Sequence, residues 1–150
     1  MPSRINHVKV VCPHPEVVNA FLTQVCDVPE GWPLGAGSPE LPDDAPLGPG
    51  GDLPLEVIGE TRGSGEGYGY IAGDPTSRQL QIFHSGTSRY WAICVSTRFI
   101  EGVYDKAKAR GVPCTPVTVA DWNDRDNIRN FFCIVDGLMF EVIRVEPKAG

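Results

Sequence analysis

Apolar residues alternate with polar ones in two similar stretches of the chain, and each stretch is followed by a helical pattern. Residues 5–12 (INHVKVVC) and 89–96 (RYWAICVS) share one pattern, and residues 80–84 (LQIFH) and 140–144 (FEVIR) share another. A strand places alternate side chains on opposite faces, so these stretches predict two matching pairs of strands. The chain therefore contains an internal repeat, which constrains its fold more than a single motif does.

The first half predicts a helix and three further strands. Pro15 suits the first turn of a helix, and the apolar spacing after it predicts an amphipathic helix. Residues 55–60, 67–73 and 79–84 predict short strands. Between the helix and these strands, residues 29–54 hold seven of the 14 prolines and six of the 17 glycines. We interpret this insertion as a long loop that covers a pocket.

The second half repeats the order of a helix followed by strands. Residues 98–110 predict a helix with Ser96 or Thr97 as its N-cap and Gly111 at its end. We expect its buried stripe to contain Phe99, Val103 and Ala107.

Three predicted strands close the second half, at residues 112–119, 128–135 and 138–145. Asp136 and Gly137 join the last two and are typical of a tight β-hairpin. The order strand, helix and three strands therefore occurs twice.

Length and composition fit one globular domain. The chain has 150 residues, a formal charge of −6, 41% hydrophobic residues and 21% charged residues. We expect a single domain over residues 1–150, with modules at about 5–85 and 89–146. The acidic balance argues against a nucleic-acid partner, because phosphate binding needs clustered Lys and Arg. No apolar run reaches the roughly 20 residues that span a bilayer, so we expect no membrane partner.

The five cysteines are odd in number and show no CxxC spacing. Four of them lie in apolar segments, and we interpret these as reduced thiols of the core. Reduced thiols, together with an N-terminus that has no signal pattern, predict a cytoplasmic protein. The five are Cys12, Cys26, Cys94, Cys114 and Cys133.

The repeat pairs four polar positions, His7 with Tyr90 and Gln81 with Glu141. Together with residues 136–141 (DGLMFE) as a closing hairpin, this pattern resembles the vicinal oxygen chelate superfamily of glyoxalases, bleomycin-resistance proteins and extradiol dioxygenases. The resemblance covers nearly the whole chain apart from the proline-rich insertion. It implies an α+β fold of two βαβββ modules, whose curved mixed sheets surround a cleft with the helices outside.

The resemblance also implies a divalent metal in the cleft, Mg²⁺, Mn²⁺, Zn²⁺ or Fe²⁺. By position, its ligands are His7, Gln81 and Glu141. Tyr90 lies where metal-dependent members usually have a histidine, so we expect it to donate a hydrogen bond to substrate. Glu141 has mostly apolar neighbours along its strand, and a buried carboxylate needs a partner. That partner is either the metal or a cation such as the Lys9 ammonium.

Three functions fit these residues. The favoured one is a metal-assisted lyase or isomerase with an enolate-like intermediate, in which Glu141 either moves a proton or anchors the metal. An extradiol dioxygenase is disfavoured because the face offers only one histidine, His7. The alternatives are a metal-free protein that sequesters an antibiotic or another natural product, and a metal-free cyclase that uses Glu141 as a base with a pKa raised by burial.

Further expectations concern the substrate and the assembly. We expect the substrate to contact Lys9, Phe83, Cys94 and Trp32. A binding protein would also stack its ligand on Trp91, Trp122, Tyr68 and Tyr70. The resemblance implies a small-molecule ligand and a homodimer.

Overall fold

The computed structural model of the chain describes residues 7–29, 39–56, 69–73, 79–83, 88 and 90–149. The chain divides into two compact units. Unit 1 contains Met1–Val11 and Glu56–Trp91, and unit 2 contains Cys12–Leu55 and Ala92–Gly150.

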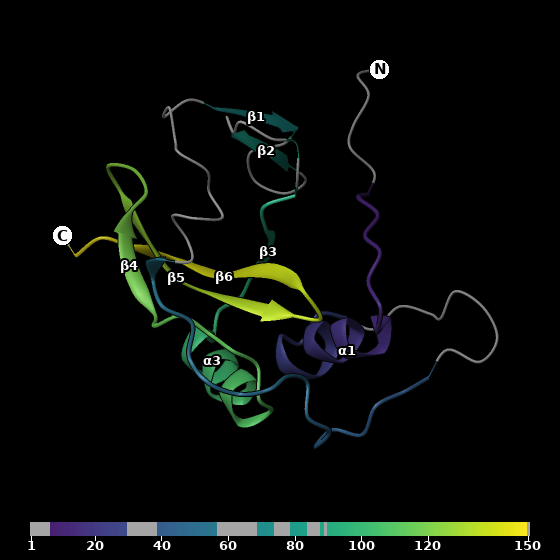
Figure 1. Cartoon of the computed structure of the whole chain (residues 1–150). Helices are drawn as coiled ribbons and strands as arrows, with labels where there is room; N and C mark the ends of the chain where they lie inside the picture. Colours follow the sequence, from purple (N-terminus) through teal and green to yellow (C-terminus); the bar gives the residue numbers. More distant parts are fainter. Residues whose placement is uncertain are drawn as a thin grey trace. The chain divides into compact units, whose positions relative to one another are not determined.

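Unit 2 contains a four-stranded mixed sheet in the order β3-β6-β5-β4 (Figure 1). Its strands are β3 (Ile93–Ser96), β4 (Thr118–Asp121), β5 (Asp126–Val135) and β6 (Leu138–Pro147). Strand β3 runs parallel to β6, and the other neighbouring strands are antiparallel. Helix α3 (Ile100–Ala109) connects β3 to β4, so the second half has the predicted order of strand, helix and three strands. The fold is α+β, as the sequence predicted.

Strands β5 and β6 form the hairpin that the sequence predicted. Asp136 and Gly137 make its two-residue turn with φ angles of 49° and 80°. Positive φ at both turn positions matches the right-handed twist of the strands, and Asp followed by Gly tolerates it. This local chemistry fixes the register, so Val135 pairs with Leu138.

Helix α3 ends at the predicted glycine. Gly111 has a φ of 79°, and its amide donates to the Lys108 carbonyl at 3.1 Å. The Val112 amide donates to the Ala107 carbonyl at 3.0 Å, which completes a Schellman end.

The start of α3 differs from its prediction. The N-cap is Phe99, which is 74% exposed, so the predicted N-caps Ser96 and Thr97 were wrong, as was the buried position of Phe99. The Thr97 hydroxyl oxygen instead accepts a hydrogen bond from the Phe99 amide at 3.2 Å. Ile100 takes the buried position and lies one turn before buried Val103.

The helix of the first half packs in unit 2. Helix α1 (Pro15–Ala20) begins at the predicted proline and continues as the π-helical turn η1 (Phe21–Val25). The Phe21 ring lies 5.1 Å from the ring of Phe140 on β6, measured between centroids. Helices α1 and α3 therefore cover the same face of the sheet (Figure 1). In an exact repeat, the helix of each half would instead cover the sheet of its own half.

Unit 1 contains the strands β1 (Gly69–Gly73) and β2 (Gln79–Phe83), which pair antiparallel. They match two of the predicted strands of the first half. Residues 7–12 and 55–56 form no strand, so the predicted strands 5–12 and 55–60 were wrong over these residues. Residues 5–6 and 57–60 lie outside the described part of the chain.

The predicted strand at residues 112–119 was wrong over most of its length, because only its last two residues belong to β4. Pro113 and Pro116 have no N–H to donate to a strand ladder. Between them, Cys114 forms an isolated antiparallel bridge to Cys133 of β5. The segment therefore lies along the edge of β5 and pairs with it as an isolated bridge and not as a strand.

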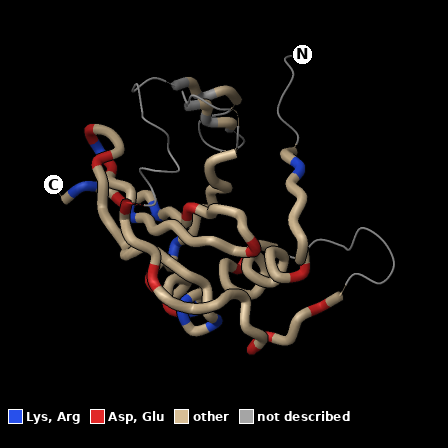
Figure 2. Tube along the Cα trace, viewed as in Figure 1, with Lys and Arg blue, Asp and Glu red and all other residues tan. Residues whose placement is uncertain are grey.

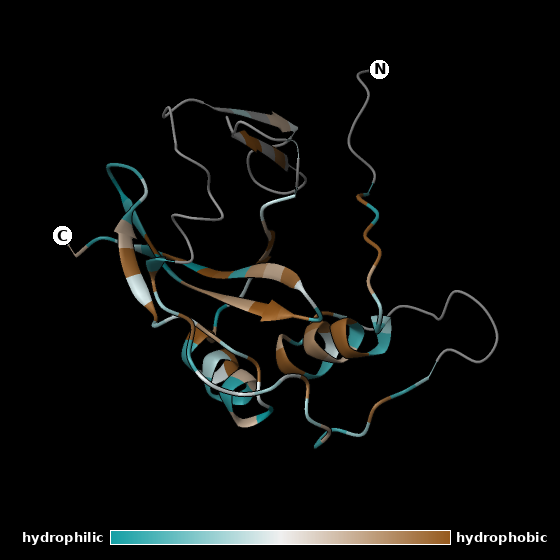
Figure 3. Ribbon diagram, in the orientation of Figure 1, coloured by the Kyte–Doolittle hydropathy of each residue, from teal (hydrophilic) through white to brown (hydrophobic). Residues whose placement is uncertain are grey.

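The core of unit 2 lies between its sheet and its helices. Figure 3 shows hydrophobic stretches in β5, β6 and the helices of this unit. The largest fully buried apolar side chains are Phe21, Val25, Ile100, Val112, Phe131, Val135, Phe140 and Val142. Since both halves of the chain contribute to this list, unit 2 depends on contacts that are distant in sequence.

Residues of opposite charge are interspersed along the chain of unit 2 (Figure 2). Arg129 of β5 pairs with Glu146 of β6 at 3.2 Å, and Arg144 of β6 approaches Glu101 of α3 at 3.7 Å. Within the described part of the chain, no helix combines the length and the apolar character needed to cross a bilayer.

Candidate functional site

Glu141 lies in the middle of β6, an inner strand of the unit 2 sheet. Its register partners are Cys94 on β3 and Phe132 on β5. Its neighbours along the strand, Phe140 and Val142, are fully buried in the core beneath the helices. Because alternate side chains point to opposite faces, Glu141 points to the face opposite the helices. The sequence predicted an inward carboxylate, and the side chain is half-buried.

The strand registers define the set of side chains on this face, which we call the Glu141 face. Its central members are Cys94, Ser96, Asn130, Phe132, Ile134, Met139, Glu141 and Ile143. Glu141 is the only carboxylate among them, and the residues beside it along β6 on this face, Met139 and Ile143, are apolar. A carboxylate in such surroundings is poised for proton transfer or for holding a cationic partner.

Cys94 lies directly across from Glu141 in the parallel β3–β6 pair. Its side chain is exposed. Crowding by protein atoms raises the pKa of the Cys94 thiol to about 12, and the negative charge of Glu141 adds to the rise. The thiol therefore keeps its proton at neutral pH, and it can donate a hydrogen bond beside the carboxylate.

The other predicted ligands belong to unit 1. His7 and Lys9 are exposed and lie in a segment that forms no strand, and Tyr90 is 71% exposed. Gln81 lies on β2, where its backbone pairs with Ile71. The convergence of these residues with Glu141 of unit 2 stays a prediction.

The predicted substrate contacts are divided in the same way. Phe83 ends β2 in unit 1, and Cys94 lies beside Glu141 in unit 2. Tyr70 and Trp122 are 68% and 49% exposed, and Trp91 is half-buried. Trp32 and Tyr68 lie outside the described residues.

The donors of unit 2 alone do not fit a divalent metal. The Glu141 face offers one carboxylate and the Cys94 thiol, which keeps its proton and is therefore a poor ligand. Across the described residues, no group of three or more His, Cys, Asp or Glu side chains is placed to hold a metal ion. The predicted set contains only two residues of these types, His7 and Glu141, so this finding does not test it.

A contact between His14 and Asp136 was missed by sequence reasoning. The His14 Nδ1 atom lies 2.9 Å from one Asp136 carboxylate oxygen, and the His14 amide donates to the other at 2.6 Å. The imidazole is 63% exposed, as expected for a surface residue. The hydrogen bond and charge of Asp136 raise the pKa of His14, and the hydrogen bond from His14 lowers the pKa of Asp136. No spacing rule links residues so far apart, so the sequence carried no signal for this pair.

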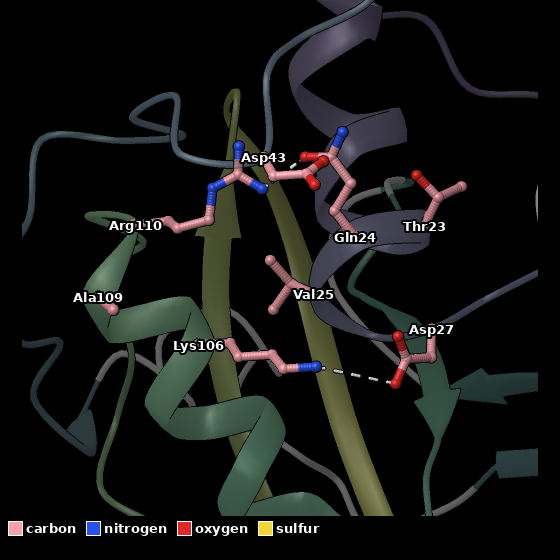
Figure 4. A pocket seen from close by; sticks show the side chains of 8 residues that line it. All are labelled: Thr23, Gln24, Val25, Asp27, Asp43, Lys106, Ala109 and Arg110. Atoms are coloured by element: carbon pink, nitrogen blue, oxygen red, sulfur yellow. Dashed lines mark hydrogen bonds and ion pairs between the residues drawn. The ribbon is translucent and has the colours of Figure 1, made fainter.

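A hollow of about 530 Å³ lies between η1, the C-terminal part of α3 and the proline-rich segment (Figure 4). Arg110 donates to the Gln24 side-chain oxygen at 2.5 Å and to the Ala45 and Pro42 carbonyls at 2.9 Å each. These bonds hold residues 39–55 against the helices, and we interpret the hollow as part of this attachment. The described part of the predicted pocket cover therefore packs on the helix side of the sheet.

Comparisons of the chain with family models, with curated proteins and with solved structures found no match.

Proposed function

We propose that the chain is a small-molecule enzyme of the lyase or isomerase type, with Glu141 as the group that moves a proton. The observation that carries this proposal is the position of Glu141. It is a half-buried carboxylate on an inner strand, flanked by Cys94 and Phe132, on the sheet face opposite the helices. A half-buried carboxylate on a sheet face can accept a proton from a substrate bound against it.

The reaction class follows from these neighbours. Glu141 takes a proton from a carbon next to a carbonyl, which leaves an enolate. In an isomerase, Glu141 returns the proton to another atom of the same substrate. In a lyase, the enolate expels a leaving group from the next carbon and a C=C bond forms. The protonated Cys94 thiol donates a hydrogen bond toward oxygen charge that develops next to Glu141, and the predicted role of Tyr90 is the same. With Glu141 acting as the base, His7 and Gln81 would hold a divalent metal, which would stabilise enolate charge when bound.

Hydrogen exchange at carbon tests this proposal without knowledge of the natural substrate. The protein is incubated in D₂O with 2-oxo acids, 2-hydroxy ketones and thiohemiacetals, with and without Mg²⁺, Mn²⁺ or Zn²⁺, and exchange is followed by NMR. We expect exchange with at least one class, and we expect Glu141→Gln to slow it by about 10²–10⁴-fold. The matched control is Glu146→Gln, on the same strand but paired with Arg129. Equal exchange rates in the Glu141→Gln variant and the wild type would rule out the proposed role.

A second candidate is the metal-free binding protein, and the apolar side chains of the Glu141 face favour it. Ile134, Met139 and Ile143 are half-buried apolar side chains on the same face as the carboxylate. In that case the wild type shows no exchange with any class of substrate, and both it and Glu141→Gln bind an aromatic natural product, as measured by quenching of tryptophan fluorescence.

A further inference from the structure

Cys114 and Cys133 face each other where the segment after α3 runs antiparallel to β5. They form an isolated antiparallel bridge, and a backbone hydrogen bond lies on either side of it, at 2.8 and 3.2 Å. This pattern defines a non-hydrogen-bonded pair, in which the Cα atoms lie about 4.5 Å apart and the side chains approach most closely. Disulfides typically join Cα atoms about 4.4–6.8 Å apart. The backbone therefore already has a spacing that a disulfide accepts.

The two side chains also lie on the same face, because residues directly opposite each other in a strand pair point the same way. The Cys114 thiol donates a hydrogen bond to the Val112 carbonyl at 3.3 Å. Both side chains are fully buried.

We infer that Cys114 and Cys133 are an oxidation site, at which a peroxide converts the two thiols into a disulfide within unit 2. The Cys114 thiolate attacks one peroxide oxygen, the O–O bond breaks, and the departing hydroxide takes a proton to leave as water. Cys133 then attacks the Cys114 sulfenic acid, the S–O bond breaks, and a second water leaves. The two thiols lose two electrons and hydrogen peroxide gains them.

The order of attack follows from the surroundings of each thiol. The Cys133 side chain and the Lys108 ammonium lower the pKa of Cys114. The Cys114 side chain and burial raise the pKa of Cys133. Cys114 is therefore the first thiolate, and Cys133 is the resolving thiol.

Access to the buried pair is through the Cys114 side. Residues 112–117 belong to no strand or helix, and Pro113 and Pro116 contribute no backbone donors. Local opening of this short segment admits hydrogen peroxide, which is small, more readily than a bulky thiol reagent. The site is independent of the proposed reaction at Glu141.

Peroxide treatment of the reduced full-length protein tests the inference. We expect the protein to lose two of its five thiols and two hydrogen atoms of mass, with no added oxygen. Peptide mapping is expected to link Cys114 to Cys133, and a dithiol reductant is expected to reverse the change. The disulfide closes a loop in the unfolded chain, so the melting temperature is expected to rise by about 10 °C.

Two variants keep the test decisive. Cys133→Ala is expected to abolish the loss of two thiols, whereas the double variant Cys12→Ser and Cys94→Ser is expected to retain it. If Cys133→Ala does not fold, the wild-type peptide map decides alone. A link to Cys26, oxygen added to Cys12 or Cys94 with both buried thiols still alkylatable, or a lower melting temperature after oxidation would overturn the inference.

Discussion

Asp136 occupies the first position of the β5–β6 turn, and its side chain holds the residue that precedes α1. Both carboxylate oxygens are used, one by the His14 imidazole and one by the His14 amide. Replacement of Asp136 by Asn keeps the turn, because Asn also tolerates a φ of 49°. It removes the charge, so we expect the pKa of His14 to fall back toward 6.5. An NMR titration measures this pKa, and an unchanged value would show that the pair does not persist in solution.

The same pair predicts a pH window for stability. The raised pKa of His14 stabilises the folded state fully below pH 6.5, and this contribution is lost as the pH rises through the raised value. The lowered pKa of Asp136 contributes above pH 3.8, and its contribution is lost as the pH falls through the lowered value. The stability difference between the wild type and Asp136→Asn is therefore expected to be largest between pH 3.8 and 6.5, as measured by urea denaturation. A difference that grows steadily toward pH 9 would contradict it.

The conformation or the orientation of a single residue was predictable where its sequence neighbours determine it. Glu141 was identified by alternation along one strand, and the turn at Asp136 and Gly137 by the rule for tight hairpins. The neighbours of Glu141 across the sheet were not stated in advance, since they depend on the register with β3 and β5. One of these neighbours is Cys94, which is the register partner of Glu141 on β3.

At the scale of elements, the proline-rich segment is fastened to the end of α3 through two close backbone contacts. The Leu47 amide donates to the Arg110 carbonyl at 2.8 Å, and the Gly50 amide donates to the Gly111 carbonyl at 2.6 Å. A Cβ atom on Gly48 would lie 2.6 Å from the Gly111 oxygen, which is backbone and has no freedom to move aside.

This contact predicts opposite effects for two glycine replacements. We expect Gly48→Ala to lower the free energy of unfolding by about 1–3 kcal/mol, because the added methyl group forces the segment away from α3. The matched control is Gly102→Ala within α3, where the added Cβ meets its nearest neighbour at an ordinary 4.0 Å. We expect this variant to gain up to about 1 kcal/mol from helix propensity. Urea denaturation followed by circular dichroism measures both, and equal effects would contradict the close approach.

The elements themselves were predictable to different degrees. Helix α3 and the β5–β6 hairpin have a clear apolar period and clear end signals, and both are present. The predicted strand at residues 112–119 failed because its two prolines outweigh its apolar residues. The position of α1 beside α3 depends on contacts such as Phe21 with Phe140, which no local pattern encodes.

At the scale of the whole molecule, the repeat in the sequence is only partly visible as a repeat in the fold. The second half has the βαβββ order with strand order β3-β6-β5-β4. The described residues of the first half give one strand pair in unit 1 and one helix in unit 2. The predicted metal site takes His7 and Gln81 from unit 1 and Glu141 from unit 2. A test of that site therefore also tests whether residues of both units bind one ion.

Metal titration of paired variants provides that test. If His7 and Glu141 bind the same Mn²⁺ ion, His7→Ala and Glu141→Gln are each expected to weaken Mn²⁺ binding by at least about 100-fold. Loss of a residue that only hydrogen-bonds a metal ligand costs up to about 100-fold, and loss of the ligand itself costs no less. The double variant is expected to bind more weakly than either single variant, because both protein ligands of the one ion are lost. The control is His14→Ala, which removes an exposed imidazole bound to Asp136. Isothermal titration calorimetry measures all four proteins. If the wild type bound two ions and each single variant lost a different one, the imidazole and the carboxylate would lie in separate sites; if the wild type bound none, the metal-free functions would remain.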